Sequence, residues 1–123
     1  MEVPLPLGDV VDRITILRIK VRKIEDVAKR VHARRELQLL ERRWSMLGHG
    51  RLPQEAELEG VNETLWEVED RLRDMEAREQ FDAAFVEAAR SVYKLNDRRA
   101  ALKRAINEAL GSELVEVKSY SSY

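Results

Sequence analysis

Residues 53–79, PQEAELEGVNETLWEVEDRLRDMEARE, decide the fold of this chain. Apolar side chains recur there at alternating steps of three and four, the period of one face of an α-helix; they are Leu58, Val61, Leu65, Val68, Leu72 and Met75. Pro53 suits the first turn of a helix, and the glutamates that follow it favour the positive end of the helix dipole. The stretch therefore predicts an amphipathic helix about 40 Å long.

Stripes of the same period predict three more helices, near residues 9–24, 26–47 and 82–110. Asp9, Asp26 and Asp82 are predicted N-caps, and Gly48 and Gly111 are suited to ending a helix. Should the break at Asp26 be absent, the first two helices would form one rod. We predict an all-α fold for 1–123 as a single domain: an antiparallel helical bundle or long helical hairpin of three to four helices. A short extended C-terminal tail, residues 111–123, would follow it.

The composition excludes several classes of site. The chain has 123 residues and no cysteine, which rules out disulfides and thiolate metal ligands. His32 and His49 stand alone, so we expect no metal site, and no pattern indicates a cofactor. No apolar run is long enough to span a bilayer, and no secretory signal is visible, so we expect a cytoplasmic protein.

Charge is unevenly distributed along the chain. Residues 12–43 hold eleven basic and five acidic side chains. Residues 55–87 hold three basic and twelve acidic side chains, and residues 90–108 hold six basic and two acidic ones. One interpretation is that an acidic middle helix packs between basic neighbours. The other is that the first basic stretch binds phosphate or an acidic partner. We favour the first, since charged residues usually lie on solvated helix faces.

A polar strip runs beside the apolar stripe of the 53–79 helix, and the last helix carries a matching one. Residues at three-and-four spacing share one helix face, so the two strips are predicted to meet along a seam. The seam would either bind an anionic ligand or form a polar layer that fixes helix register. Its candidate residues are Asn62, Trp66, Glu69, Arg73, Arg90, Tyr93, Asn96, Asp97, Arg98 and Lys103.

Three stretches carry a family resemblance: LGDVVDRITIL at 7–17, NETLWEVED at 62–70, and ARSVYKLNDRRA at 89–100 followed by KSY at 118–120. Together they resemble a bacterial domain family of unknown function. The resemblance implies proximity or fusion to glycosyltransferase and tetratricopeptide segments of cell-surface polysaccharide pathways. The chain lacks the proline that such proteins often carry near the Asp26 turn.

Two functional hypotheses follow. The first is a helical interaction or assembly module without catalytic activity, acting as a homodimer or with another protein and linked to surface-polysaccharide synthesis. The second is a binder or enzyme for a phosphorylated or sugar-nucleotide ligand at the seam, with Glu69 or Asp97 as acid–base. No catalytic motif is present, and a pI near 6.2 argues against nucleic-acid binding.

Overall fold

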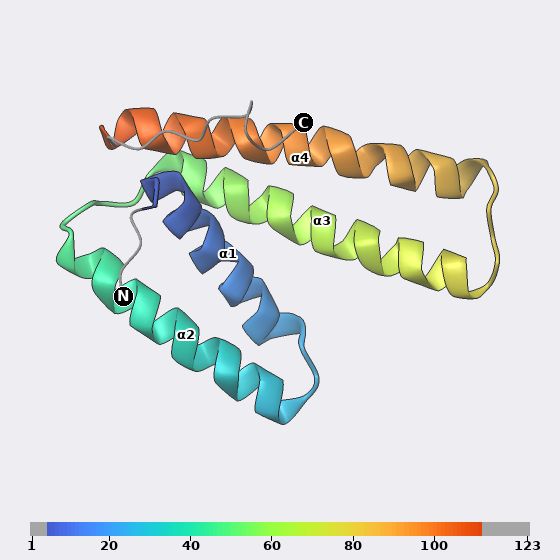
Figure 1. Cartoon of the computed structure of the whole chain (residues 1–123), viewed down its shortest axis with the longest axis horizontal. Helices are drawn as coiled ribbons and strands as arrows, with labels where there is room; N and C mark the ends of the chain where they lie inside the picture. The colour runs from blue at the N-terminus through green and yellow to red at the C-terminus, as the bar shows by residue number, and fades with distance from the viewer. Residues whose placement is uncertain (1–4, 112–123) are drawn as a thin grey trace.

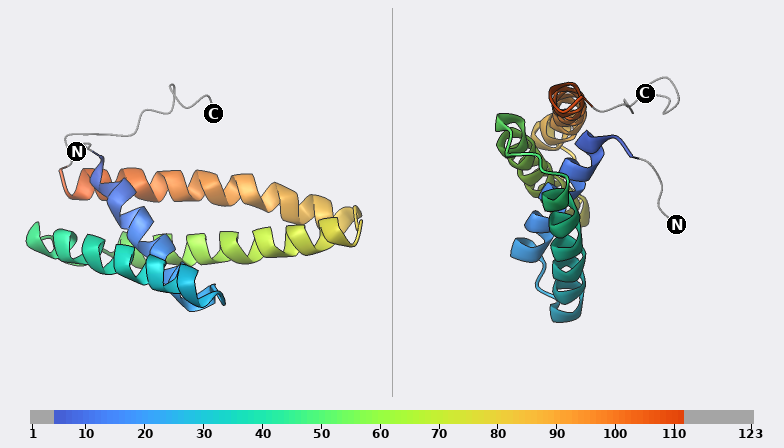
Figure 2. Two further views of the ribbon diagram at one scale, coloured as in Figure 1. Left: turned by 60° about the horizontal axis from the view of Figure 1, so that its bottom comes forward. Right: turned by 90° about the vertical axis from the view of Figure 1, so that its left-hand side faces the viewer.

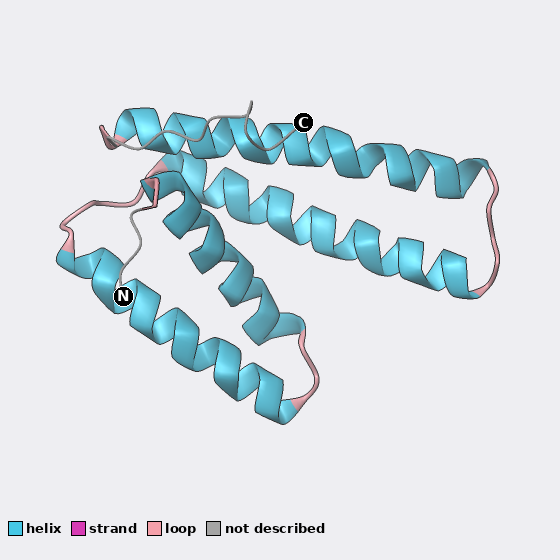
Figure 3. Ribbon diagram, viewed as in Figure 1, coloured by secondary structure: helices cyan, strands magenta, loops and turns pink. Residues whose placement is uncertain are grey.

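The computed structural model describes residues 5–111, which form four helices. They are α1 (Leu7–Lys23), α2 (Val27–Met46), α3 (Pro53–Ala77) and α4 (Ala83–Ala109) (Figures 1 and 3). No strand occurs among these residues, so the prediction of an all-α bundle is confirmed. The tail predicted at 111–123 lies outside the described residues from 112 onward. In the described part of the chain, no helix is long and apolar enough to cross a membrane.

The four helices are arranged around α1. Helices α3 and α4 form an antiparallel hairpin, and α1 packs against α2, α3 and α4 (Figure 1). The backbone of α2 lies beside that of α1 alone. The half of the hairpin that includes the α3–α4 turn extends beyond α1 and α2, as Figures 1 and 2 show. We call this half the distal hairpin and define it as residues 70–95.

The helix boundaries follow local capping chemistry. The side chain of Asp26 accepts a hydrogen bond from the Lys29 N–H at 3.0 Å, so α1 and α2 are separate helices, as the Asp26 break predicted. The N-cap predicted at Asp9 is wrong. Helix α1 begins at Leu7, two residues before the predicted start of the helix at residue 9, and Pro6 is its N-cap. The earlier start places the N–H of Gly8 against α4, where a side chain accepts from it.

The apolar core lies where α1 meets the beginning of α3 and the end of α4. Val11, Leu58, Leu102 and Ile106 are almost completely buried there. Trp44 of α2 packs against this cluster, so the core also anchors the second helix. The stripe that predicted α3 is therefore its buried face.

Asp82 caps α4 and makes stability depend on pH. The Phe85 N–H and the Gln80 side chain donate hydrogen bonds to its carboxylate, and they lower the pKa of Asp82. A carboxyl group whose pKa is lower when folded adds stability above its unfolded pKa, about 4, and loses that contribution as pH falls through the folded value. Asp82→Ala should therefore be less stable than the wild type at pH 7, and urea unfolding should show the difference shrinking toward pH 3. A difference independent of pH would contradict this assignment.

Candidate functional site

A cluster of polar side chains is buried where α1 crosses the hairpin. Counted as whole residues, Asp12, Thr15 and Asn62 are each at most 6% exposed. The side-chain nitrogen of Asn62 donates to Asp12 Oδ1 and to Thr15 Oγ1, both at 2.9 Å. Because each of these groups has a partner, the cluster does not leave its polar atoms desolvated and unbonded. The cluster links α1 to α3.

Arg99 completes the cluster from α4. Its Nε lies 2.9 Å from Asp12 Oδ1, and its terminal nitrogen lies 2.6 Å from Asp12 Oδ2. Two parallel charge-assisted bonds of this kind are stronger and more directional than single neutral ones. Asp12 thus connects three helices: its own helix α1, α3 through Asn62, and α4 through Arg99.

A second set of contacts fixes the start of α1 on the end of α4. The Gly8 N–H donates to Asn107 Oδ1 at 2.7 Å, and Lys103 forms a 2.8 Å ion pair with Asp9. A Cβ at Gly8 would lie 2.4 Å from the backbone oxygen of Lys103, closer than such atoms approach. Only glycine permits this close approach of the two helices.

Gly8→Ala should lower the free energy of unfolding by about 2 kcal/mol, because the added methyl group meets backbone that moves only if α4 shifts. Gly60→Ala is the matched control, since no atom lies within 4 Å of its Cβ position. The control should raise stability by about 1 kcal/mol, the helix-propensity difference. Urea unfolding of both variants checks this. Equal effects at the two glycines would show that α1 does not pack this closely.

Beside the polar cluster lies a small groove of about 150 Å³ between α1, α3 and α4. Trp66 and Glu69 of α3 line it together with Asn96 and Arg99 of α4. Ile16, Ile19 and Leu65 supply apolar wall, and Asn62 reaches it from the buried cluster. The groove therefore combines an aromatic ring, an amide, a carboxylate and a guanidinium group, a set able to bind a small polar ligand.

The structure brings some of the predicted seam residues together and separates others. Asn62, Trp66, Glu69 and Asn96 line the groove, whereas Lys103 is held by Asp9 at the end of α4. Glu69 and Asn96 are exposed although they line the groove. The remaining candidates are exposed as well: Arg73, Arg90, Tyr93, Asp97 and Arg98. Arg73 pairs with Asp70, and Arg98 pairs with Glu57.

The strips on α3 and α4 make their buried contacts with α1, which the spacing did not indicate. Asn62 and Arg99 both bond to Asp12, and Lys103 bonds to Asp9. Asp12, Thr15 and Arg99 were not among the candidates. A signal was present in the sequence, because α1 is apolar on several sides, and a helix of that kind is packed on several sides.

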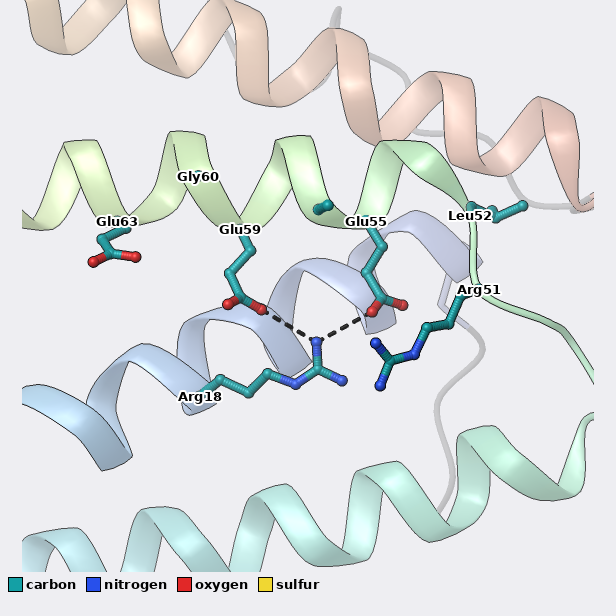
Figure 4. A pocket seen from close by; sticks show the side chains of 8 residues that line it. Arg18, Arg51, Leu52, Glu55, Glu59, Gly60 and Glu63 are labelled. Carbon is teal, nitrogen blue, oxygen red and sulfur yellow. Dashed lines mark hydrogen bonds and ion pairs between the residues drawn. The ribbon is translucent and has the colours of Figure 1, made fainter.

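Ion pairs between α1 and α3 explain much of the charge layout. Arg18 lies between Glu55 and Glu59, at 3.1 and 3.2 Å, in an open groove that Arg51 and Leu52 also line (Figure 4). Arg22 continues the row with Glu59 and Glu63. Burial lowers the pKa of Arg18, but its hydrogen bonds to Glu55, Glu59 and Glu41 outweigh burial, and the net shift is upward. The acidic helix does pack against a basic neighbour.

No described residue suggests a metal centre. Within residues 5–111, no group of three or more histidine, aspartate or glutamate side chains is arranged to hold a metal ion. The glutamates of α3 that face α1 each pair with an arginine or lysine: Glu55, Glu59, Glu63 and Glu67.

Comparison with known proteins gives one result. No curated protein and no solved structure matches the chain. The model of a family of unknown function (DUF6165) matches residues 1–123, and the chain belongs to that family.

Proposed function

We propose that this protein is a helical assembly module that forms a homodimer through the distal hairpin. The main support for this proposal is that α1 covers one half of the α3–α4 hairpin, while the distal half exposes large apolar side chains. Tyr93 is 56% and Val86 53% exposed, although they lie seven residues apart on one face of α4. Phe81, at the turn, is also more than half exposed and packs edge-on against Phe85.

The exposed face continues the one that α1 covers. Tyr93 lies three residues before Asn96, which lines the groove against α1, so both occupy the same side of α4. A two-helix hairpin buries only the side where its helices meet. The stable arrangement for such a hairpin is packing against further helices, as α1 does in the other half.

The charges of the distal hairpin suit a second copy of this chain. Its exposed residues include acidic side chains of α3, such as Glu76, and basic side chains of α4, such as Arg90. In the proposed two-fold dimer Tyr93 lies near the axis and meets its own copy, whereas charged residues away from the axis meet different residues of the partner, so a surface with both signs complements itself. Two distal hairpins would then form an antiparallel four-helix bundle.

Light scattering coupled to size exclusion tests the dimer. The wild type should elute with twice the 14.3 kDa mass of one chain. Val86→Glu/Tyr93→Glu should be monomeric, with an unchanged helical circular-dichroism spectrum, because both positions are exposed in the single chain. Val27→Glu/Val31→Glu on α2 is the matched control and should remain dimeric. A monomeric wild type, or a dimeric distal variant, would overturn the proposal.

The cellular setting is proposed from the family resemblance alone. The resemblance supports a role in the cytoplasm in bacterial cell-surface polysaccharide synthesis, where an assembly module would hold a glycosyltransferase in a complex. Deleting the coding sequence should then alter the amount or chain length of surface polysaccharide. Unchanged polysaccharide would remove this part of the proposal.

A second candidate is binding of an anionic small molecule in the groove between α1, α3 and α4. Its support is that Trp66, Glu69 and Asn96 converge there around Arg99. A phosphorylated sugar or sugar nucleotide would place its ring on Trp66 and its hydroxyl groups on Glu69 and Asn96. A thermal-shift screen with these compounds tests this, with Glu69→Gln and Asn96→Ala as variants. No shift for the wild type would exclude the candidate.

A further inference from the structure

The basic residues of the first two helices fall into two groups in the structure. Four of the five basic residues of α1 pair with carboxylates: Arg18, Arg22 and Lys23 pair with glutamates of α3, and Arg13 pairs with Glu36. On α2 the situation is reversed. Five side chains there form neither an ion pair nor a side-chain hydrogen bond with any residue of 5–111; they are Lys29, Arg30, Arg34, Arg35 and Arg42.

The carboxylates of α2 do not neutralise these cations. Glu36 pairs with Arg13 and Glu41 with Arg18, both of α1. The two glutamates of α2 therefore pair with α1. Lys29 lies in the groove between α1 and α2, whereas Arg34, Arg35 and Arg42 are exposed. Of the two interpretations of the basic stretch, internal pairing accounts for four of the five basic residues of α1 and leaves those of α2 unexplained.

Exposed aliphatic side chains lie among these cations. Val27, Val31, Leu39 and Met46 are between 42% and 79% exposed. These four side chains lie along one side of α2, at steps of about four residues, and Arg35 and Arg42 lie between them. The side opposite carries Ala33, Leu37, Leu40 and Trp44, which face the rest of the protein. We call the outer side the α2 outer face.

The position of α2 makes the whole outer face accessible. The backbone of α2 lies beside α1 alone, and the helix forms one edge of the molecule (Figures 1 and 2). Its 20 residues give a straight surface about 30 Å long. A flat partner can contact such an edge along its length without requiring a groove.

We propose that the α2 outer face binds the surface of an anionic lipid membrane, an interaction separate from the assembly role of the distal hairpin. Arginine and lysine attract acidic headgroups, and the aliphatic side chains between them enter the boundary of the acyl region. A nucleic acid would also attract the cations, but it offers aliphatic side chains little, since bases stack on aromatic rings. Trp44, the aromatic residue of α2, is half-buried, and its ring lies tilted against the ring of His49.

Vesicle co-sedimentation with the full chain tests this surface. The wild type should bind vesicles of phosphatidylcholine and phosphatidylglycerol, should not bind pure phosphatidylcholine, and should bind less as salt rises. Arg35→Glu/Arg42→Glu should weaken binding by about tenfold or more. Arg71→Glu/Lys94→Glu makes the same change in net charge on exposed residues of the hairpin and, with its oligomeric state checked by light scattering, should bind as a wild-type protein of that state does.

A second pair of variants separates membrane insertion from simple charge attraction. Leu39→Ser/Met46→Ser keeps every charge and changes only exposed positions, so folding should be unaffected. It should reduce the binding that persists at high salt. Three results would overturn the proposal: no binding to anionic vesicles, equal loss in the two charge-reversal variants, or tighter binding to duplex DNA than to anionic vesicles at the same salt.

Discussion

Replacing Asp12 by alanine is expected to lower the free energy of unfolding by about 3 kcal/mol. The change removes the carboxylate that Arg99 contacts with two nitrogens and that Asn62 contacts with a third. The side chain of Asp12 is only 9% exposed, so water cannot easily replace it, whereas Arg99 is 30% exposed and recovers part of its hydration. For that reason we expect the low end of the range for broken buried ion pairs.

Chemical denaturation checks this prediction, with Asp97→Ala as the control. Asp97 is exposed on α4 and has no ion pair within residues 5–111, so its removal should change stability by less than about 0.5 kcal/mol. A double-mutant cycle with Arg99→Ala should give a coupling energy of about 1–3 kcal/mol. A coupling near zero would show that Asp12 and Arg99 do not hold α1 against α4.

Leu58→Ala should destabilise the protein by about 3–4 kcal/mol. Leu58 is 0% exposed and packs with Val11 and Ile106 where three helices meet. Truncating it removes apolar contact and leaves a cavity that α3 cannot close without moving away from α1 and α4. A loss of this size is a large part of the total stability of an ordinary domain, about 5–15 kcal/mol.

The matched control is Leu39→Ala, the same substitution on the outer face of α2. Leu39 is 50% exposed, so we expect a change below about 1 kcal/mol. Urea unfolding with far-ultraviolet circular dichroism measures both. Similar losses at Leu39 and Leu58 would contradict the placement of the core.

The helices were predictable from sequence because their determinants are local. The stripe from Leu58 to Met75 places α3, and Asp26 and Asp82 cap the helices that follow them. The error at Asp9 has a tertiary cause. Helix α1 begins after Pro6 because Gly8 must reach Asn107 of α4, and that contact spans nearly the whole chain.

The site was predictable only in part. The strip spacing identified Asn62, Trp66, Glu69 and Asn96, which the structure places around one groove. The spacing could not show that α1 covers half of the strip, because the crossing of α1 depends on Asp12 and Arg99, which lie 87 residues apart. Nor could it distinguish the paired cations of α1 from those of α2, since pairing depends on which helix lies opposite.

Site-directed cross-linking tests the central proposal, dimerisation through the distal hairpin, most directly. The chain has no cysteine, so Tyr93→Cys introduces a single thiol on the proposed interface, and Arg34→Cys introduces one on an exposed position of α2, outside that interface. Under mild oxidation or with a short bifunctional reagent, dimerisation through the distal hairpin predicts rapid formation of covalent dimers for Tyr93→Cys and little for Arg34→Cys. Equal cross-linking at the two positions, or none at residue 93, would contradict it.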